Sequence, residues 1–373
     1  MQIRVLFFIE SLEGGGAEKV LETLVRHIDK KKYDLTVIAI SGGGKYEKSI
    51  ASHAKYSCLL RHPSCYRGIK KIFYALKYKL IYSWLPNWLI YRLFIPKGFD
   101  VEVAFVEGFA TKLLAASCNK HAKRIAWVHC DLKVQPWTMS AGVYRSRNEE
   151  AHVYGKYDAV VCVSRNVDSV MKELYGLSNT MTIYNPIDER DIKNLALQKC
   201  EWGVDGSQFN IISVGRLEKV KGYDKLIPII KNVRNKGVDV HLWIVGNGTQ
   251  KGVLENLVKR VNLEGCVTFT GFMKNPYSLM SKMDLFVCSS RAEGFSLVIG
   301  EAMILGIPVI SMNCAGPREL ISMCNAGVLC GSYDEMEREI IKGYHEKTQV
   351  LYDLTSFDIT QIISQVEKMM CKE

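Results

Sequence analysis

Short apolar strand patterns alternate with amphipathic helical patterns along this chain, and that alternation restricts the possible folds more than any other feature. The first half opens with a strand pattern at 3–9, a glycine turn at 14–16 and a helical pattern at 20–28, and a second strand pattern follows at 35–40. A strand, a crossover helix and a strand form a βαβ unit, which belongs to a parallel sheet. Further patterns predict strands at 101–106, 124–128 and 159–163, and a helix between Ser164 and Gly176.

The alternation starts again after Tyr184-Asn185-Pro186, where Asn-Pro breaks regular structure. Strand patterns in the second half lie at 209–214, 240–245, 267–270, 285–288 and 308–311. The predicted fold class is therefore α/β, with two doubly wound Rossmann-like domains. We place the first domain at 1–185 and the second at 186–350, and we expect a C-terminal helix in 351–373 to pack back towards the first domain. Ligands of such sheets bind at the carboxyl ends of the strands, so motifs at those ends are the candidates for a site.

Composition excludes several classes of protein. The 373 residues are 48% hydrophobic and 24% charged, which suits a globular chain of two domains. None of the 12 cysteines forms a Cys-x-x-Cys pair, so zinc ribbons and redox motifs are not expected and a reducing cytosol fits. Neither a secretory signal nor an apolar stretch of about 20 residues is visible. The sequence predicts a cytoplasmic protein that does not cross a membrane.

The net charge of +10 comes from one segment. No acidic residue occurs between Lys48 and Phe99, whereas ten basic residues do, and the rest of the chain is balanced. A nucleic-acid-binding protein would be expected to spread its basic residues more widely, so we expect no nucleic-acid partner. The segment predicts a local surface for something anionic.

The part of this segment from 66 to 97 is basic, amphipathic and aromatic. A helix predicted from Gly68 to Ser83 carries its apolar residues on one face: Ile69, Ile72, Phe73, Leu76 and Leu80. The residues expected to meet a membrane are Lys70, Lys71 and Lys77 on the opposite side or flank, with Trp84 and Trp88 beyond the helix. This pattern is typical of a helix lying in a membrane interface, although a helix packed on its own domain is the alternative. We favour the anionic membrane surface, which predicts exposed tryptophans.

Two loops at strand ends carry the residues that indicate chemistry. In Gly215-Arg216-Leu217-Glu218-Lys219-Val220-Lys221-Gly222, a strand ends in glycine and two cations follow, which suit a diphosphate unless they are only solvated surface charges. In the second loop, Glu293 precedes a helix predicted over 297–305, with Ser296 as its N-cap. The free N–H groups of such a helix start bind anions. Glu293 and Glu301 are acceptors suited to sugar or ribose hydroxyls, and a salt-bridged surface role fits Glu301 poorly because its helix is apolar.

These residues resemble glycosyltransferase family 4. The resemblance rests on Gly14-Gly15-Gly16-Ala17-Glu18, on Arg216 and Lys221, on Asn185-Pro186 and on two glutamates separated by seven residues, and it covers nearly the whole chain. It implies a GT-B fold, whose two domains face an interdomain cleft with the acceptor on the N-terminal side. It also implies transfer of a sugar from a nucleotide diphosphate with retention of anomeric configuration.

The resemblance further implies roles for individual residues. Arg216 and Lys221 would hold the diphosphate, Glu301 the ribose and Glu293 the donor sugar. The backbone from Phe295 through Ser296 to Leu297 would lie beside the phosphates and sugar, Phe272 beside the base, and Gly15 and Gly16 would approach the diphosphate from the other domain. His129, which follows a strand end in the first half, would lie near the donor sugar and is our catalytic candidate together with Arg216, Lys221 and Glu293; an isolated histidine is otherwise most often structural.

No Asp-x-Asp occurs in the chain, although a divalent cation on donor phosphates usually needs a close acidic pair. We therefore predict a metal-independent enzyme with no cofactor, in which cationic side chains and helix-end N–H groups balance the leaving charge.

The function predicted is a retaining hexosyl- or N-acetylhexosaminyltransferase in capsule, O-antigen or exopolysaccharide biosynthesis. A UDP-sugar is favoured over a GDP-sugar as donor, and the acceptor is a glycan, favoured to be lipid-linked. The protein would lie on the cytoplasmic face of the inner membrane. The alternatives are a GT-B nucleotide-sugar epimerase, which needs no lipid-facing segment, and a non-catalytic scaffold, which has no need to keep all four polar site residues.

Overall fold

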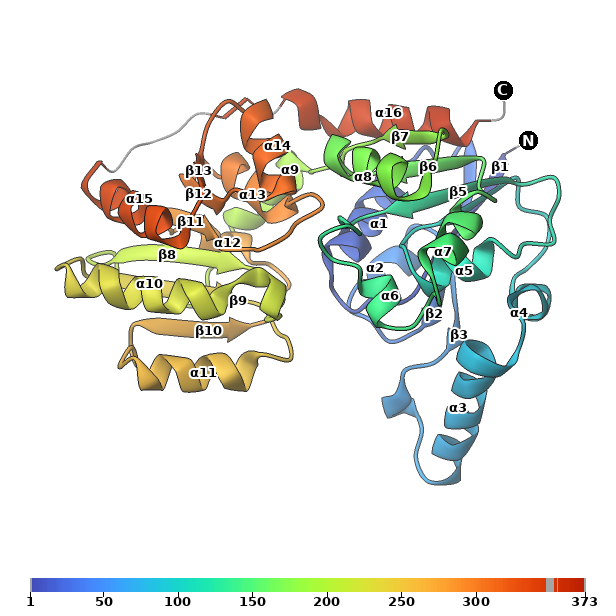
Figure 1. The fold of residues 1–373 in the computed structure, drawn as a ribbon, viewed down its shortest axis with the longest axis horizontal. Helices are drawn as coiled ribbons and strands as arrows, with labels where there is room; N and C mark the ends of the chain where they lie inside the picture. Colours follow the sequence, from blue (N-terminus) through green and yellow to red (C-terminus); the bar gives the residue numbers. More distant parts are fainter. Residues whose placement is uncertain (1, 347–351, 354, 372–373) are drawn as a thin grey trace. The chain divides into compact units, whose positions relative to one another are not determined.

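The computed structural model describes residues 2–346, 352–353 and 355–371. The chain divides into two compact units. Unit 1 comprises Met1–Pro186 with Ile359–Glu373, and unit 2 comprises Ile187–Asp358. Each unit is a parallel sheet with helices around it (Figure 1).

The sheet of unit 1 has seven strands in the order β3-β2-β1-β4-β5-β6-β7. They are β1 (Ile3–Ile9), β2 (Tyr33–Ser41), β3 (Lys55–Leu60), β4 (Val101–Ala104), β5 (Lys123–Val128), β6 (Ala159–Cys162) and β7 (Thr180–Thr182). The first strand is central: Val5 pairs with Leu35 on one side and with Val101 on the other. Its residues from Val5 to Ile9 are all buried, which explains why a continuous apolar run rather than an alternating one forms this strand.

The helices of unit 1 follow the predicted pattern where caps mark their ends. α8 (Arg165–Tyr175) begins after Ser164, whose Oγ accepts a hydrogen bond from the Val167 N–H at 3.2 Å, and ends at Gly176 with φ 64°. The others outside the basic segment are α1 (Gly16–His27), α2 (Glu47–Ala51), α5 (Phe109–Leu114), α6 (Trp137–Ser140), α7 (Arg147–Tyr154) and α16 (Ile359–Met370).

The C-terminal helix α16 belongs to unit 1 although it is far from that unit in the sequence. The Glu367 carboxylate accepts a hydrogen bond from the Asp29 N–H at 2.9 Å, and the Tyr33 hydroxyl donates to the Glu367 carbonyl at 2.9 Å. The boundary that we placed between 350 and 351 lies outside the described residues.

The sheet of unit 2 has six strands in the order β10-β9-β8-β11-β12-β13. They are β8 (Phe209–Val214), β9 (Val240–Val245), β10 (Val267–Gly271), β11 (Leu285–Cys288), β12 (Val309–Met312) and β13 (Val328–Cys330). Its helices are α9 (Glu189–Ala196), α10 (Tyr223–Asn235), α11 (Lys251–Arg260), α12 (Tyr277–Met280), α13 (Leu297–Ile304), α14 (Ala315–Met323) and α15 (Tyr333–Glu346). Every strand predicted from the sequence is present, whereas the edge strands β3, β7 and β13 were missed.

Strand order defines one special position in each sheet. In unit 2 the chain builds from β8 outward through β9 and β10, then returns to the other side of β8 with β11. Helix connections leave opposite faces at this reversal, so a ligand-binding crevice is expected beyond the carboxyl ends of β8 and β11. The equivalent point of unit 1 lies between β1 and β4.

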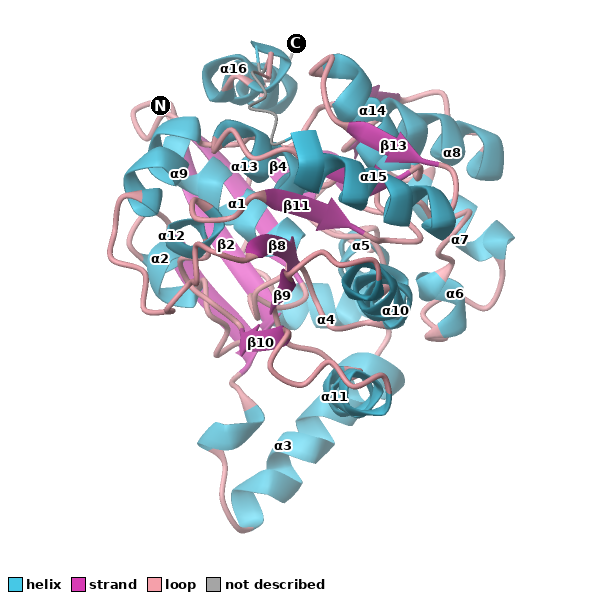
Figure 2. Cartoon of the chain, turned by 90° about the vertical axis from the view of Figure 1, so that its left-hand side faces the viewer, coloured by secondary structure: helices cyan, strands magenta, loops and turns pink. Residues whose placement is uncertain are grey.

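The basic segment forms a helical projection from unit 1. It consists of α3 (Ile69–Lys79), a π-helical turn η2 (Leu80–Trp84) and α4 (Asn87–Phe94). Figure 1 and Figure 2 both show α3 extending away from the strands of its unit. Within the described parts of the chain, no helix combines the length and apolarity needed to cross a bilayer.

Candidate functional site

The loops that follow β8 and β11 meet at the reversal point of unit 2. The Lys221 Nζ lies 2.6 Å from Glu293 Oε1, and the Ser290 hydroxyl donates to the same oxygen at 2.7 Å. The two charged side chains are only 18% and 12% exposed. Burial by itself would lower the pKa of the Lys221 ammonium, but the Glu293 carboxylate outweighs it and the net pKa is raised. Lys221 is therefore a fixed cation at this crevice.

Further contacts hold the backbone around Lys221 in place. The Ser289 hydroxyl donates to the Lys221 carbonyl at 2.8 Å, and the Arg291 N–H donates to the Val220 carbonyl at 2.7 Å. The Arg291 guanidinium binds both carboxylate oxygens of Asp224, at 2.9 and 2.7 Å. Sequence reasoning did not single out Ser289, Ser290 or Arg291. Their position directly after β11 was the available signal, but only the strand order shows that β11 neighbours β8.

Gly222 allows the two loops to approach this closely. Its φ is 70°, and a Cβ built on it would lie 2.1 Å from the Ser289 carbonyl oxygen. Only glycine adopts this left-handed backbone conformation without strain, and only a residue without a Cβ fits in the space.

We expect Gly222→Ala to destabilise unit 2 more than a comparable substitution elsewhere. Gly237 also has a left-handed φ, of 90°, but a Cβ built on it would meet nothing within 4 Å, so Gly237→Ala reports the backbone strain alone. That strain costs roughly 1–2 kcal/mol, which lowers Tm by roughly 2–8 °C in a domain of this size. The loss of stability in Gly222→Ala should be larger than in Gly237→Ala because the Ser289 carbonyl oxygen must also move. Thermal unfolding of the two variants tests this. Equal Tm values would show that the Ser289 loop can shift at no cost in stability.

Arg216 lies on the same loop, at the open side. Its side chain is exposed and makes no hydrogen bond or ion pair with any described residue. The loop itself is anchored, because the Leu217 N–H donates to the Asn247 carbonyl at 2.9 Å and the Glu218 carboxylate accepts from the Thr249 hydroxyl at 2.8 Å. A guanidinium on an anchored loop beside Lys221 is well placed to receive an anion.

The start of α13 faces the same crevice without a side-chain cap. Ser296 occupies the N-cap position as predicted, but its hydroxyl does not bond the first turn; that part of the prediction is wrong. The Ser296 residue is 2% exposed, and its Oγ has no hydrogen-bond partner among the described residues. Ser146 and Ser164 cap their helices with the same group, so the difference is local. An uncapped helix start and a buried hydroxyl without a partner are groups that a bound anion would satisfy.

Glu301 lies in the second turn of α13 and is 2% exposed. Phe295 and Leu297, the neighbours of Ser296, are buried as well. Gly316, at the start of α14, donates its N–H to the Glu293 carbonyl at 3.1 Å. A Cβ on Gly316 would lie 3.0 Å from that oxygen, so α14 packs directly on the loop that carries Glu293.

Phe272 follows β10, two strands from β8, and is half-buried. The neighbouring Gly271 carbonyl accepts a hydrogen bond from the Gly246 N–H at 2.9 Å, which joins the ends of β9 and β10. The structure thus brings Arg216, Lys221, Glu293 and Ser296 to one crevice and places Phe272 further along the same edge.

The remaining predicted residues belong to unit 1, at the equivalent edge of its sheet. Gly15 precedes α1 and Gly16 begins it, just after the end of β1. His129 follows β5; its N–H donates to Glu107 Oε2 at 2.9 Å, and its Nε2 lies 2.9 Å from the Phe105 carbonyl oxygen. Since a carbonyl only accepts, Nε2 carries the proton. Burial lowers the pKa of His129 against the opposing effects of Glu107 and Phe105, so the ring is neutral at pH 7.

Glu10, directly after β1, carries a half-buried carboxylate that the sequence did not indicate. The Tyr82 hydroxyl donates to its Oε1 at 3.3 Å. Burial raises the pKa of Glu10; the Tyr82 hydrogen bond opposes this shift and the nearby Glu107 charge adds to it. The folded state therefore binds this proton more tightly than the unfolded chain does.

We expect Glu10→Gln to stabilise unit 1 progressively as pH rises. A raised pKa means that ionised Glu10 costs stability above its unfolded pKa, and glutamine removes this cost while still accepting from Tyr82. Urea unfolding from pH 4.5 to pH 8 should show a variant-minus-wild-type difference that grows with pH. Glu13→Gln, at an exposed position of the same loop, is the matched control. A pH-independent difference would contradict the argument.

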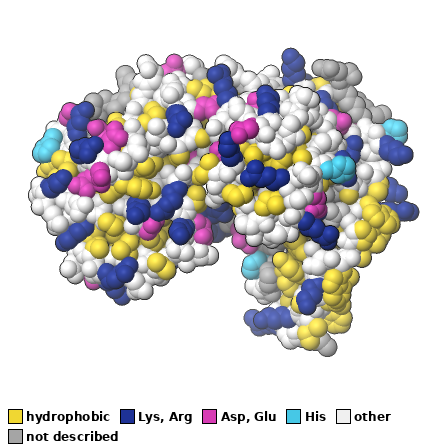
Figure 3. Space-filling model, viewed as in Figure 1, with side chains coloured by type: hydrophobic (Ala, Val, Ile, Leu, Met, Phe, Trp, Pro, Cys, Tyr) yellow, Lys and Arg dark blue, Asp and Glu magenta, His cyan; other side chains and the backbone are white. Residues whose placement is uncertain are grey.

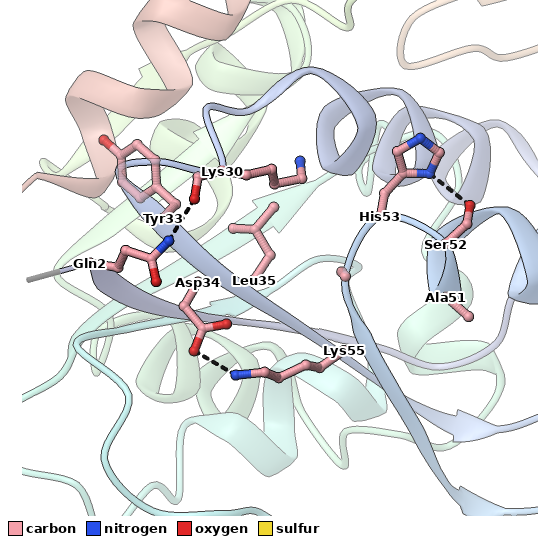
Figure 4. A pocket seen from close by; sticks show the side chains of 10 residues that line it. Gln2, Lys30, Tyr33, Asp34, Leu35, Ala51, Ser52, His53 and Lys55 are labelled. Atoms are coloured by element: carbon pink, nitrogen blue, oxygen red, sulfur yellow. Dashed lines mark hydrogen bonds and ion pairs between the residues drawn. The ribbon is translucent and has the colours of Figure 1, made fainter.

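Two other features bear on the site. Within the described residues, no three His, Cys, Asp or Glu side chains are grouped to hold a metal ion. A cavity of about 380 Å³ in unit 1 is lined by Gln2, Tyr33, Asp34, His53 and Lys55, among others (Figure 4). These residues lie at the amino ends of β1, β2 and β3, the edge of the sheet opposite to the one where ligands bind.

Comparison with known proteins decides the family. The sequence model of Glycosyltransferase Family 4 matches residues 14–191, and that of Glycosyl transferases group 1 matches residues 196–350. The chain belongs to glycosyltransferase family 4. The family predicted from the motifs is thereby confirmed.

Relatives of this transferase are found in several bacteria. An uncharacterised glycosyltransferase of Haemophilus influenzae is 26% identical over 91% of this chain and 89% of its own length. A Campylobacter jejuni N-acetylgalactosaminyltransferase whose named substrate is a diphospho-undecaprenol glycan is 29% identical over 86% of this chain and 84% of its own. An Escherichia coli O-antigen biosynthesis glycosyltransferase, WclY, is 36% identical over 42% of this chain and 44% of its own.

Solved structures show the fold of the transferase. Anabaena HepE, in complex with UDP and glucose, superposes with a TM-score of 0.75 at 20% identity and covers 99% of both chains. A sucrose-phosphate synthase from Thermosynechococcus elongatus gives a TM-score of 0.72 at 16% identity, with 99% and 98% covered. The predicted α/β class and GT-B fold are confirmed.

Proposed function

We propose that the chain is a retaining glycosyltransferase that uses a nucleotide diphosphate sugar, with UDP as the favoured nucleotide. The observation that carries this proposal is the crevice of unit 2, where the paired Lys221 and the exposed Arg216 lie beside an uncapped helix start and the unpartnered Ser296 hydroxyl. Cations and buried donors without partners suit a diphosphate. HepE structures with UDP and with UDP-glucose support UDP rather than GDP.

The proposed mechanism assigns each side chain a part. Arg216 and Lys221 bind the diphosphate, and the first turn of α13 with Ser296 receives its remaining oxygens. Glu293 keeps Lys221 charged and in position, and its second oxygen is available to accept from a sugar hydroxyl; Glu301 takes the ribose. As the bond between the anomeric carbon and the diphosphate oxygen breaks and the acceptor hydroxyl bonds to that carbon, negative charge grows on the leaving diphosphate, and these preorganised positive groups stabilise it without a metal ion.

The proposed acceptor is a lipid-linked glycan in the synthesis of a surface polysaccharide, and the transferred sugar is a hexose or N-acetylhexosamine. The names of three relatives support this setting: the Campylobacter enzyme that acts on a diphospho-undecaprenol glycan, the O-antigen enzyme WclY and an Erwinia amylovora amylovoran enzyme. We further propose that His129 and the Gly15-Gly16 turn, at the edge of unit 1 where such a sheet binds ligands, take part in the transfer.

We also propose that the helical projection of unit 1 docks on the cytoplasmic face of the inner membrane. Three residues of its apolar face, called the apolar stripe below, are not packed on the domain: Ile72, Phe73 and Leu76 are 68%, 64% and 44% exposed. Trp84 and Trp88 are exposed too, at 60% and 50%. On the face in Figure 3, hydrophobic and basic side chains gather over this projection. Exposed apolar side chains flanked by lysines fit an anionic bilayer.

One lysine assigned to this surface also contacts the body of unit 1. Lys77 Nζ donates to the Leu59 carbonyl at 2.8 Å and lies 5.4 Å from the centre of the Phe94 ring. This hydrogen bond fastens the projection to unit 1, although Lys77 is exposed like Lys70 and Lys71.

Thermal shift with UDP, GDP and ADP tests the donor assignment. Ligand at 100 times its Kd should add ~2.7 kcal/mol to stability, and UDP should give the largest shift. No shift with any of the three would contradict the proposal. Transfer from a radiolabelled UDP-sugar should persist in EDTA; abolished transfer would refute metal independence.

A further inference from the structure

Four tyrosines form a continuous ladder that starts just before the helical projection and runs along it. Ring centroids lie 5.1 Å apart for Tyr66 and Tyr74, 6.3 Å for Tyr74 and Tyr78, and 4.5 Å for Tyr78 and Tyr82. The ladder then continues from Tyr82 to Phe109 of α5 at 4.6 Å. This is a surface feature: Tyr78 is 45% exposed, and Tyr66, Tyr74 and Tyr82 are half-buried.

The ladder lies on the side of α3 opposite to the apolar stripe. Tyr74 and Tyr78 are each two residues from Ile72 and Leu76, respectively, and two residues correspond to about 200° around an α-helix. The stripe is therefore turned away from the tyrosines, and the tyrosine side contacts the body of unit 1 through Tyr82. A membrane that receives the stripe leaves most of the ladder uncovered, and Lys70 and Lys71, four and three residues before Tyr74, would reach its headgroups from the opposite side or flank of the helix.

The π-helical turn η2 keeps the ladder straight. In an α-helix, residues four apart advance about 400°, so a row at this spacing drifts by about 40° per step. A π turn contains more residues per turn and begins at Leu80, so the advance from Tyr78 to Tyr82 is closer to a full turn and the drift is reduced. Tyr82 thereby reaches Glu10 at the end of β1.

The inner end of the ladder coincides with the reversal point of the sheet in unit 1. Glu10 follows β1, and Phe109 begins α5 after β4; these two strands are the neighbours between which a Rossmann-like sheet binds its ligands. The ladder therefore leads from the outer part of the projection to a candidate ligand crevice.

We propose that the tyrosine ladder is the binding platform for the saccharide part of the acceptor; this rests on the proposed transferase function. A pyranose has apolar C–H patches and a rim of hydroxyls, and tyrosine matches both with its ring and its hydroxyl. The hydroxyls of Tyr74 and Tyr78 make no hydrogen bond with any described residue. Such hydroxyls favour a polar, water-soluble ligand over a lipid chain. Tyrosines also bind with little loss of side-chain entropy, since only two torsions are fixed.

Saturation-transfer NMR with maltotriose, cellotriose and chitotriose tests the platform. Irradiating the aromatic protons of the wild-type protein should transfer saturation to at least one trisaccharide. Tyr74→Ala/Tyr78→Ala should weaken its apparent affinity by on the order of tenfold, and Tyr74→Phe/Tyr78→Phe should retain most of the ring contact. Ile72→Ala/Leu76→Ala, on the opposite face, is the matched control and should leave the transfer unchanged.

Three outcomes would overturn the platform. The first is absence of transfer to all three trisaccharides in the wild type, and the second is equal loss in the tyrosine and control variants. The third is loss of binding to vesicles of phosphatidylglycerol and phosphatidylethanolamine in the tyrosine variant with saccharide contact intact, which would assign the ladder to the membrane. The UDP thermal shift separates this question from the donor: it should be the same in every variant, and its absence in the wild type would refute the transferase function alone.

Discussion

Replacing Lys221 by alanine is expected to lower kcat/KM for sugar transfer by about ten- to a hundredfold and to weaken UDP binding in parallel. A hydrogen bond to a charged group contributes roughly 1.5–3 kcal/mol, and Lys221 is the buried, positioned cation of the crevice. Steady-state kinetics with a UDP-sugar and UDP titration calorimetry measure the two effects. Lys219→Ala, two residues away on the same loop, is the matched control and should retain activity.

The same substitution should also destabilise unit 2, because it leaves the buried Glu293 carboxylate without its cation while the Ser290 hydroxyl still donates to Oε1. A double variant, Lys221→Met/Glu293→Gln, removes both charges. Its stability should return towards the wild type while transfer stays lost, which separates the catalytic effect from the folding effect. Wild-type activity in the double variant would show that this pair is structural and that the diphosphate binds elsewhere.

Vesicle binding is expected to fall by about a hundredfold when Ile72, Phe73 and Leu76 are replaced by serine. Each side chain is largely exposed in the free protein, so each forfeits on the order of 1 kcal/mol of apolar burial in a bilayer, and every 1.4 kcal/mol is about tenfold in the partition coefficient. Co-sedimentation with phosphatidylglycerol vesicles measures the loss. Leu197→Ser, at a residue of unit 2 that is 87% exposed, is the control for a generally less apolar surface.

Charge reversal should act on the same equilibrium through a salt-dependent contribution. Lys70→Glu/Lys71→Glu forfeits ~1 kcal/mol of attraction per site and adds repulsion, and the effect should shrink as salt shortens the Debye length to about 8 Å at physiological ionic strength. Lys274→Glu/Lys282→Glu, with the same charge change in unit 2, should leave binding unaltered. Equal sedimentation of wild type and both serine and glutamate variants would make the projection an ordinary surface.

Prediction from the sequence was accurate where local chemistry dominates. The strands at 3–9, 209–214, 240–245 and 285–288 were placed to the residue, because buried parallel strands are continuous apolar runs between turn residues. The helix between Ser164 and Gly176 was placed equally well, since its cap and its left-handed end are both local. β3, β7 and β13 were missed because these edge strands bury few residues and carry a weak pattern.

Some features of the candidate site could likewise be predicted from the sequence, whereas others depend on the tertiary structure. The chain by itself determined two parallel α/β units, the glycine turns, and the residues that follow the strands. All of these depend on the spacing of apolar and turn residues along the chain, which specifies local backbone geometry. Strand order decided that β8 and β11 are neighbours, and therefore that Lys221 and Glu293, 72 residues apart, form an ion pair while Ser289 and Arg291 hold the loop between them. Tertiary packing also decided that Ser296 leaves its helix uncapped, that Lys77 bonds to Leu59, and that the apolar stripe faces outward while the tyrosines lead inward. Each of these depends on which partner a side chain meets across the fold, and periodicity along one helix specifies a face without specifying what that face contacts.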